Sequence, residues 1–250
     1  MKNNILEITN LNKTYHTKDK EIEAINNINL EIKEEEFISI VGPSGCGKST
    51  ILTILAGILN KSSGDIKYKK ESIKTGYMLQ EDALFPWRTV LDNSCLGLEI
   101  NNKLTSENKQ KVIDLLKKYG LKDFINSYPN SLSGGLKQRV ALIRTLALDP
   151  DILLLDEPFS ALDYQTRLAL SDDLYKIIKN EKKTAIMVTH DIAEAISMSD
   201  KVIIMSKRPG TVKEVIGINL DNKSIPTLNR KDKKFTMYYD RIWKVLDHHI

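Results

Sequence analysis

The stretch EFISIVGPSGCGKST, residues 36–50, places a glycine-rich loop directly after a short apolar run. The run EFISIVG is apolar enough to form a buried strand, and STILTILAGIL after it has helical spacing. The loop GPSGCGKS matches the pattern G-x-x-x-x-G-K-[ST] in the strand-to-helix context that this pattern requires. Glycines let backbone N–H groups surround phosphate oxygens, so the stretch predicts a nucleotide-phosphate site rather than a surface turn.

The side chains of this loop predict nucleotide phosphates with Mg²⁺ as the ligand. Lys48 would reach the β- and γ-phosphate oxygens, and the Ser49 hydroxyl would bind Mg²⁺. The residues expected to contact the nucleotide here are Gly42, Pro43, Ser44, Gly45, Cys46, Gly47, Lys48, Ser49 and Thr50.

Two adjacent carboxylates follow a second apolar run, DILLLDEP, at residues 151–158. Asp156 and Glu157 fall where a buried strand would end, which is the ligand-bearing edge of an α/β sheet. Such a pair is often only a helix cap, but the phosphate loop upstream favours a catalytic site. We expect Asp156 to hold the Mg²⁺ site and Glu157 to orient or deprotonate the attacking water.

Three further residues have both a structural and a functional interpretation. His190 ends the strand-like run TAIMVTH and is placed to hydrogen-bond a γ-phosphate, although a lone histidine at a strand end is more often structural. Gln80 ends TGYMLQ, and its amide could contact the metal and the water. Tyr15 lies about one hairpin before the loop and could stack on adenine. The residues alone leave these alternatives open.

A second anion-binding turn is predicted in NSLSGGLKQRVAL, Asn130–Leu142. Ser133, Gly134 and Gly135 would open a helix, and the free N–H groups and dipole of a helix N-terminus favour an anion. A chain of this size thus carries two phosphate-binding turns built on the same physics.

Composition sets broad limits on the class of protein. The 250 residues are 41% hydrophobic and 28% charged, which is ordinary for a globular protein. The net charge of +4 comes from scattered lysines rather than the dense basic stripe of nucleic-acid-binding proteins. Two cysteines form no disulfide framework and indicate a reducing compartment. No stretch approaches the roughly 20 apolar residues that span a bilayer.

Strands alternating with helices predict an α/β fold with a mostly parallel sheet. We expect one domain over residues 1–250: a nucleotide-binding core with an N-terminal antiparallel β subdomain (1–80 and 151–216), an inserted helical subdomain (81–150), and a tail (217–250). In the tail, Phe235, Tyr238, Tyr239, Ile242, Trp243 and Leu246 recur at helical spacing and predict one packed helix.

Taken together, these motifs resemble the ATP-binding subunit of ABC transporters over nearly the whole chain. Tyr15 matches the adenine-stacking aromatic, residues 42–49 the Walker A loop, and Gln80 the Q-loop. The remaining matches are LSGGLKQR with the ABC signature, ILLLDE with the Walker B strand, Ser160–Asp163 with the D-loop, and His190 with the switch histidine. The resemblance implies a P-loop NTPase core of the RecA-like type.

The resemblance also explains the two anion-binding turns. In this family two subunits dimerise head to tail with two ATP molecules between them. It implies that Ser133, Gly134 and Gly135 complete the site of the neighbouring subunit. Asp163 of the D-loop would also contact nucleotide, and Lys48, Gln80, Glu157 and His190 would be catalytic. Mg²⁺ would be held by Ser49, Gln80 and Asp156.

LQEDALFPWRTVLDN (residues 79–93) and SKRPGTV (206–212) resemble segments of the nitrate, sulfonate and taurine importer group. This implies a homodimer bound to integral membrane permease subunits at the cytoplasmic face of the cell membrane. A substrate-binding protein would be an indirect partner, and nucleic acid would not be one.

One alternative is an ATPase that acts on nucleic acid, which would show DNA-stimulated hydrolysis. A module that has lost catalysis would lack Lys48, Glu157 or His190, and all three are present.

Overall fold

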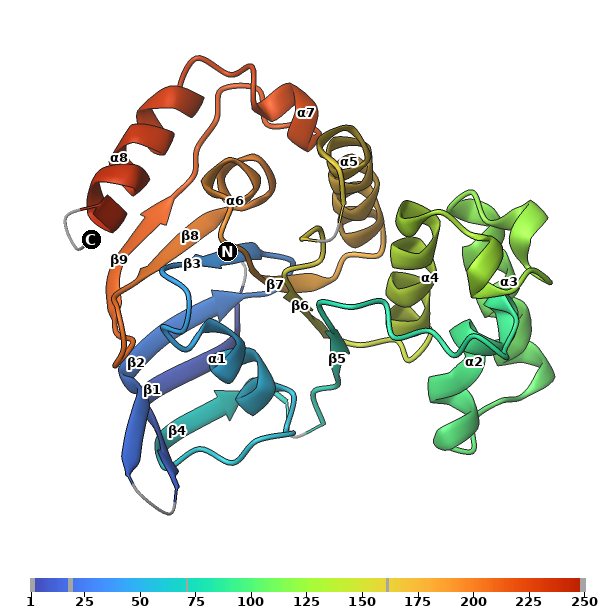
Figure 1. The fold of residues 1–250 in the computed structure, drawn as a ribbon, viewed down its shortest axis with the longest axis horizontal. Helices are drawn as coiled ribbons and strands as arrows, with labels where there is room; N and C mark the ends of the chain where they lie inside the picture. Colours follow the sequence, from blue (N-terminus) through green and yellow to red (C-terminus); the bar gives the residue numbers. More distant parts are fainter. Residues whose placement is uncertain (1–2, 18–19, 71, 161, 248–250) are drawn as a thin grey trace.

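A computed structural model describes residues 3–17, 20–70, 72–160 and 162–247, arranged around two β-sheets (Figure 1). The strands of the larger, six-stranded sheet are, in spatial order, β5 (Thr75–Met78), β6 (Ile152–Asp156), β7 (Thr184–Val188), β3 (Phe37–Val41), β8 (Lys201–Met205) and β9 (Val212–Gly217). All pair in parallel except β8 and β9, which are antiparallel. The smaller sheet is antiparallel, with the order β2 (Glu21–Lys33), β1 (Asn4–His16) and β4 (Ser63–Tyr68). The predicted fold class is confirmed.

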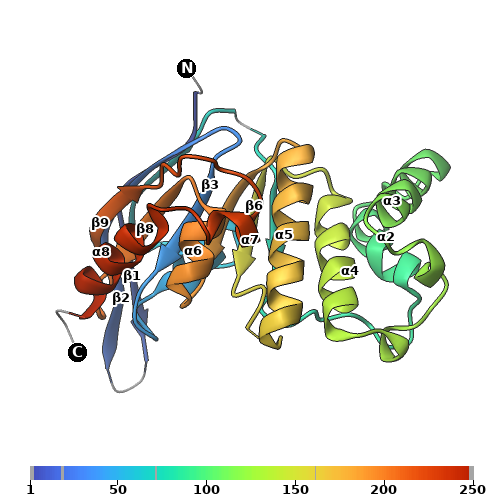
Figure 2. The same ribbon diagram turned by 90° about the horizontal axis from the view of Figure 1, so that it is seen from above.

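The parallel strands are apolar runs because both faces of the sheet are covered. Every residue of β3, β6 and β7 is buried. The α-helices are α1 (Lys48–Leu55), α2 (Val90–Ile100), α3 (Ser106–Lys118), α4 (Gly134–Leu146), α5 (Tyr164–Asn180), α6 (Ile192–Met198), α7 (Pro226–Asn229) and α8 (Phe235–Asp247). Figures 1 and 2 place α1 and the small sheet on one side of the large sheet and α5, α6 and α8 on the other.

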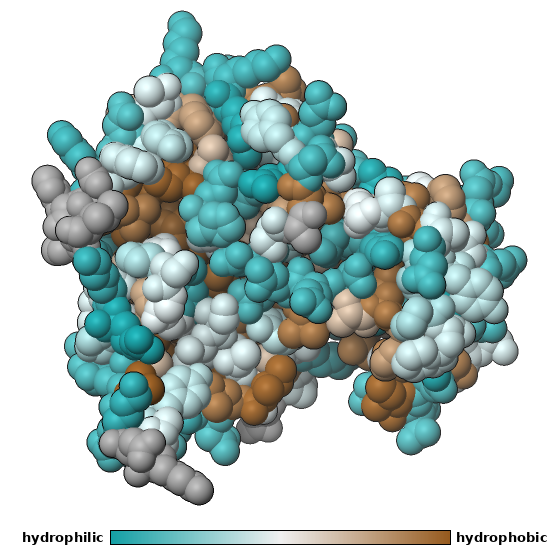
Figure 3. Space-filling view, in the orientation of Figure 1, coloured by the Kyte–Doolittle hydropathy of each residue, from teal (hydrophilic) through white to brown (hydrophobic). Residues whose placement is uncertain are grey.

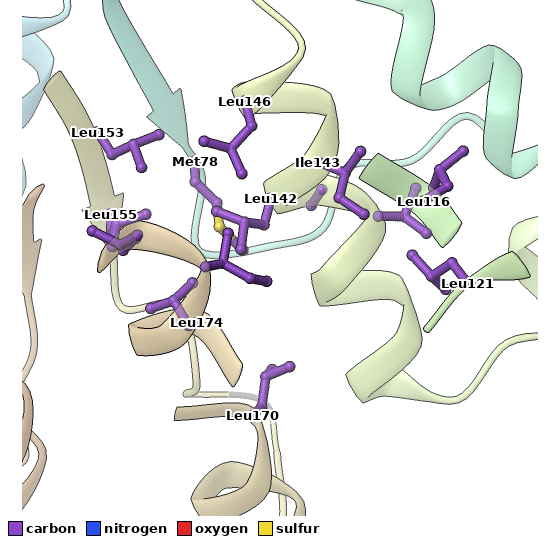
Figure 4. Close-up of a cluster of buried hydrophobic side chains, with 14 of the residues drawn as sticks. Met78, Leu116, Leu121, Leu142, Ile143, Leu146, Leu153, Leu155, Leu170 and Leu174 are labelled. Carbon is purple, nitrogen blue, oxygen red and sulfur yellow. The ribbon is translucent and has the colours of Figure 1, made fainter. Parts of the chain in front are cut away.

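Three clusters of buried apolar side chains hold these layers together. The first lies between the two sheets and α1, and the second between α6, α8 and the strands β8 and β9. The third joins the β5 edge of the large sheet to α2, α3, α4 and α5. Figure 4 shows Leu142 and Leu146 of α4 beside Met78 of β5, while Ile143 of α4 faces Leu116 of α3. Helix α4 therefore connects the outer helices to the sheet.

Helix α3 is capped at both ends. The Thr105 side chain accepts a hydrogen bond from Asn108 N at 3.2 Å, and Gly120 ends the helix with a φ of +78°. Strand β5 ends at Met78, two residues before Gln80. Gln80 thus lies beyond its strand rather than at its last position.

The C-terminal part is more structured than the sequence indicates. Strand β9 was not predicted because Lys213 and Glu214 interrupt its apolar pattern, which an edge strand with one exposed face tolerates. Residues 217–247 carry two helices instead of one. Helix α8 packs through Tyr238 and Ile242 as expected, but Trp243 is 51% exposed and lies against Tyr239 at a ring separation of 6.3 Å.

Buried Asn93 fixes the segment that leads into α2. Its Oδ1 accepts from Phe85 N at 2.8 Å, and its Nδ2 donates to the carbonyls of Phe85, Arg88 and Thr89 at 3.0–3.1 Å. The side chain is fully buried. The carbonyls of Phe85 and Thr89 also accept backbone N–H groups, so Phe85 N and Arg88 O depend most on this side chain.

Asn93→Ala should therefore lower the free energy of unfolding by about 1–3 kcal/mol, because it leaves buried polar groups unpaired. Urea unfolding followed by circular dichroism measures this. Asn101→Ala is the matched control: Asn101 bonds Gly97 O at 2.7 Å at the exposed end of the same helix, and its loss should cost within about 0.5 kcal/mol. Equal stability of the two variants would contradict the assignment.

Candidate nucleotide-binding site

The glycine loop joins β3 to α1 and is shaped by close packing against β2. Gly47, at the N-terminus of α1, has a φ of +102°, where residues with a Cβ are disfavoured. A Cβ there would lie 2.4 Å from Ile25 Cγ2 and 2.9 Å from Ala24 O. A side chain at this position would therefore displace the loop from β2. Because glycine cannot cap the helix, the first N–H groups of α1 stay available to an anion.

The Lys48 ammonium is buried among the carbonyl groups of its own loop. Nζ donates to Gly42 O at 2.8 Å and to Pro43 O at 2.9 Å, and Cys46 Sγ lies 3.9 Å away. Burial raises the pKa of the Cys46 thiol, so the thiol stays neutral beside the charged lysine. The loop thus holds a positive charge at the place where the sequence predicts phosphate.

Both oxygens of the Asp156 carboxylate accept hydrogen bonds. Ser49 Oγ donates to Oδ1 and Tyr77 Oη donates to Oδ2, each at 2.9 Å. The Ser49 hydroxyl and the Asp156 carboxylate are hard oxygen donors, which Mg²⁺ prefers. The described residues contain no group of three or more His, Cys, Asp or Glu side chains able to hold a metal. Two protein ligands fit Mg²⁺, since it keeps several waters and takes other ligands from substrate phosphates.

Glu157 occupies a strained backbone position next to His190. Its φ is +44°, which is unfavourable for a residue with a Cβ, and its N–H donates to Val188 O at 2.9 Å. Glu157 Oε2 lies 3.3 Å from His190 Nδ1. The His190 side chain is 59% exposed, so it does not fill the core as a structural histidine would. The arrangement points both side chains toward solvent at the carboxyl end of the sheet.

Some of the predicted residues line one cleft of about 250 Å³, whereas Asp156 and His190 are not among its lining residues. Tyr15, Lys48, Ser49 and Glu157 line it, together with Arg208 from the β8–β9 connection. Tyr15 Oη lies 3.4 Å from Thr50 Oγ1, and the exposed side chain lines the cleft. The cleft brings the predicted aromatic, phosphate-binding and carboxylate groups together.

The other predicted residues lie outside this cleft. Gln80 Nε2 donates to Ser160 Oγ at 3.3 Å, three residues beyond Glu157. Asp163 caps α5: its carboxylate accepts from Thr166 N at 3.0 Å and Thr166 Oγ1 at 2.7 Å, and these bonds lower its pKa. Residue 161 of the predicted D-loop lies outside the described residues.

The second anion-binding turn begins α4, as predicted. Ser133 Oγ accepts a long hydrogen bond of 3.4 Å from Leu136 N. A Cβ on Gly134 would lie 3.1 Å from Leu162 Cδ2, and one on Gly135 3.1 Å from Thr166 Cγ2. The turn therefore packs beside the start of α5, and within one subunit it does not line the cleft.

The sequence interpretation missed two features of the site. Tyr77 lies in a strand whose apolar pattern gave no reason to single out its hydroxyl. The β8–β9 connection was noted only as the segment SKRPGTV, yet Gly210 N donates to Ala24 O and Asn26 N donates to Gly210 O, both at 2.9 Å. Both features depend on contacts between segments that are far apart in the sequence.

Comparison with known proteins places this geometry in a family. The family model described as "ABC transporter" matches residues 25–160. The uncharacterized ABC transporter ATP-binding protein YtlC of Bacillus subtilis is 42% identical over 248 residues, covering 97% of this chain and 95% of that protein. The aliphatic sulfonates import ATP-binding protein SsuB of Bacillus thuringiensis is 38% identical, covering 97% and 96%.

A solved structure agrees with these relatives. The ATP-binding cassette MJ0796, described as dimeric and bound to ADP and Pi in a post-hydrolysis state, superposes with a TM-score of 0.72 and 34% identity. The match covers 86% of this chain and 99% of that one. The chain belongs to the ABC transporter family, as its ATP-binding subunit, and is an ATPase. Within the described residues, every helix is too short or too polar to cross a bilayer.

Gly210→Ala should weaken ATP binding about tenfold or more, equivalent to about 1.4 kcal/mol. An added Cβ would lie 1.9 Å from Cys46 O, so the phosphate loop or the β8–β9 connection must move. Titration with a fluorescent ATP analogue measures the change. Gly217→Ala, on the same hairpin and with open space around the added Cβ, should bind as the native chain does. Native affinity in both variants would show that the contact is unimportant.

Proposed function

We propose that this chain is the ATP-hydrolysing subunit of an importer for a small solute such as an aliphatic sulfonate, nitrate or taurine. One observation carries the ATP-dependent part: the cleft joins Lys48, Ser49 and Glu157, while the turn at Ser133–Gly135 lies outside it. The importer assignment is supported by sulfonate-import relatives that align along nearly the whole chain.

In the proposed site, Tyr15 stacks on the adenine and the N–H groups of residues 42–50 hold the phosphates. Lys48 exchanges its carbonyl partners for phosphate oxygens. Ser49 and Asp156, with Gln80 after a local movement, would hold Mg²⁺, which when bound neutralises charge on the phosphates. The 2.9 Å hydrogen bond between Ser49 and Asp156 supports this part of the assignment.

Glu157 is proposed to accept the proton of the attacking water. Its carboxylate is only partly exposed, and it lies 3.3 Å from the His190 ring. His190 would also donate a hydrogen bond to the γ-phosphate. Hydrolysis then needs little movement of these two groups, because the strands β6 and β7 already place them side by side.

A second copy of the chain is the proposed partner at the cleft. Ser133, Gly134, Gly135 and Asp163 of each subunit would complete the neighbour's ATP site. The dimeric state described for MJ0796 supports this arrangement. The γ-phosphate would then join the two surfaces, and its loss would release them.

The helical part, residues 81–150, is proposed to contact integral membrane permease subunits at the cytoplasmic face of the membrane. Trp87 is 71% exposed and lies against Phe85 with a ring separation of 5.0 Å. Figure 3 shows hydrophobic side chains in separate patches on a mostly hydrophilic face, one of them in the region of the outer helices. An exposed aromatic pair of this kind is typical of a protein contact. A substrate-binding protein would act through the permease, and nucleic acid has no part in this scheme.

Glu157→Gln should reduce ATP turnover about 10²–10⁴-fold while ATP binding persists, because the amide cannot accept the proton. Losing a negative charge beside the γ-phosphate should also let an ATP-bound dimer accumulate. Phosphate release and size-exclusion chromatography with Mg-ATP measure the two effects. Glu181→Gln, whose carboxylate bonds Lys118 and Tyr119 away from the cleft, is the control. A Glu157→Gln variant with native turnover would remove Glu157 from this role.

The shared site is tested with a mixed dimer of Lys48→Ala and Ser133→Arg subunits carrying different tags. Each homodimer should trap no ATP, because both of its sites are damaged. In the mixed dimer, head-to-tail sharing leaves one site with an intact loop and an intact signature turn. We expect one occluded ATP per mixed dimer, counted after isolation on both tags. If each subunit used its own turn, every site would stay damaged and no ATP would be trapped.

A further inference from the structure

Tyr77 reaches the Asp156 carboxylate from the neighbouring strand. In the parallel register, Tyr77 pairs with Leu154, and Asp156 lies two residues further along β6. Residues two apart on a strand share a face, so the Tyr77 side chain runs along the sheet surface toward Asp156. The result is the 2.9 Å hydrogen bond from Tyr77 Oη to Asp156 Oδ2.

The surroundings of Tyr77 place its ring in the core and its hydroxyl against the Asp156 carboxylate. The ring packs partly buried against the apolar cluster between the sheets and α1. An ionised carboxylate only accepts hydrogen bonds, so in this contact the Tyr77 hydroxyl is the donor. Ser49 occupies the other carboxylate oxygen. The two donors come from different elements, α1 and β5, and hold Asp156 from opposite sides.

We infer that Tyr77 is a positioning residue that holds the Asp156 carboxylate in the orientation needed for Mg²⁺. The inference rests on the proposed role of Ser49 and Asp156 as the protein groups that hold the ion. When the Ser49 oxygen serves as a ligand, the bond from Tyr77 to Oδ2 still fixes the rotation of the carboxylate. Groups that orient a metal-binding carboxylate in this way typically change metal affinity 10–100-fold when removed.

Tyr77→Phe tests this, since it removes the hydroxyl and keeps the ring. We expect native affinity for a fluorescent ATP analogue in EDTA. The Mg²⁺ concentration that half-saturates the metal-dependent gain in nucleotide affinity should rise about tenfold or more. Thermal unfolding in EDTA verifies that the fold is intact.

Tyr68→Phe is the matched control. Tyr68 packs against the same apolar cluster, and its hydroxyl donates to Leu55 O at 3.3 Å, away from Asp156. This variant should keep the native Mg²⁺ dependence. A native Mg²⁺ dependence in Tyr77→Phe would overturn the inference. So would equal weakening of nucleotide binding with and without Mg²⁺, because it would indicate a general structural role.

Asp156→Asn separates this inference from the proposed metal site. If the site is correct, the Asn variant should lose most of the Mg²⁺-dependent gain in nucleotide affinity, measured in the same titration. If it keeps the native gain, the proposed metal site itself fails, whatever Tyr77 does. A loss in Asp156→Asn with no change in Tyr77→Phe would reject only the positioning role.

Discussion

The hydrogen bond between Ser49 and Asp156 joins the two halves of the site, because it connects the first turn of α1 to the end of β6. In the sheet, β6 is separated from β3, the strand that leads into the loop and α1, by β7, the strand that precedes His190. The bond is possible only because the buried strands end at the same edge. Apolar packing on both faces of the sheet therefore sets the positions of polar groups that it never contacts directly.

Much of the fold and site could be predicted because its signals are local. The loop at residues 42–50 is recognisable from its glycines and lysine. The carboxylates at 156 and 157 follow a continuous apolar run that predicts a strand. The turn at Ser133–Gly135 that begins α4 is likewise recognisable within a few residues. In each case one short segment contains both the sequence pattern and the local structure that it forms.

The rest could not be predicted because it depends on register and close approach. Tyr77 matters only once β5 pairs with β6 at a particular offset, and Gly210 only once its loop lies against Cys46 O. Strand β9 is not recognisable in the sequence because charged residues interrupt its apolar pattern, and its position at the sheet edge permits them. The roles of Gln80 and Asp163 stay predictions, since their observed hydrogen bonds are to Ser160 and Thr166.

The buried position of Lys48 has a consequence for nucleotide affinity. Its ammonium already has two carbonyl partners, so an arriving phosphate does not meet a bare charge but replaces existing bonds. The carbonyl groups of the loop compete with phosphate for the Lys48 ammonium. The free energy of phosphate binding therefore reflects the difference between these two sets of hydrogen bonds. An ATPase that must release and rebind nucleotide in every cycle benefits from a lysine that has hydrogen-bond partners both with and without nucleotide.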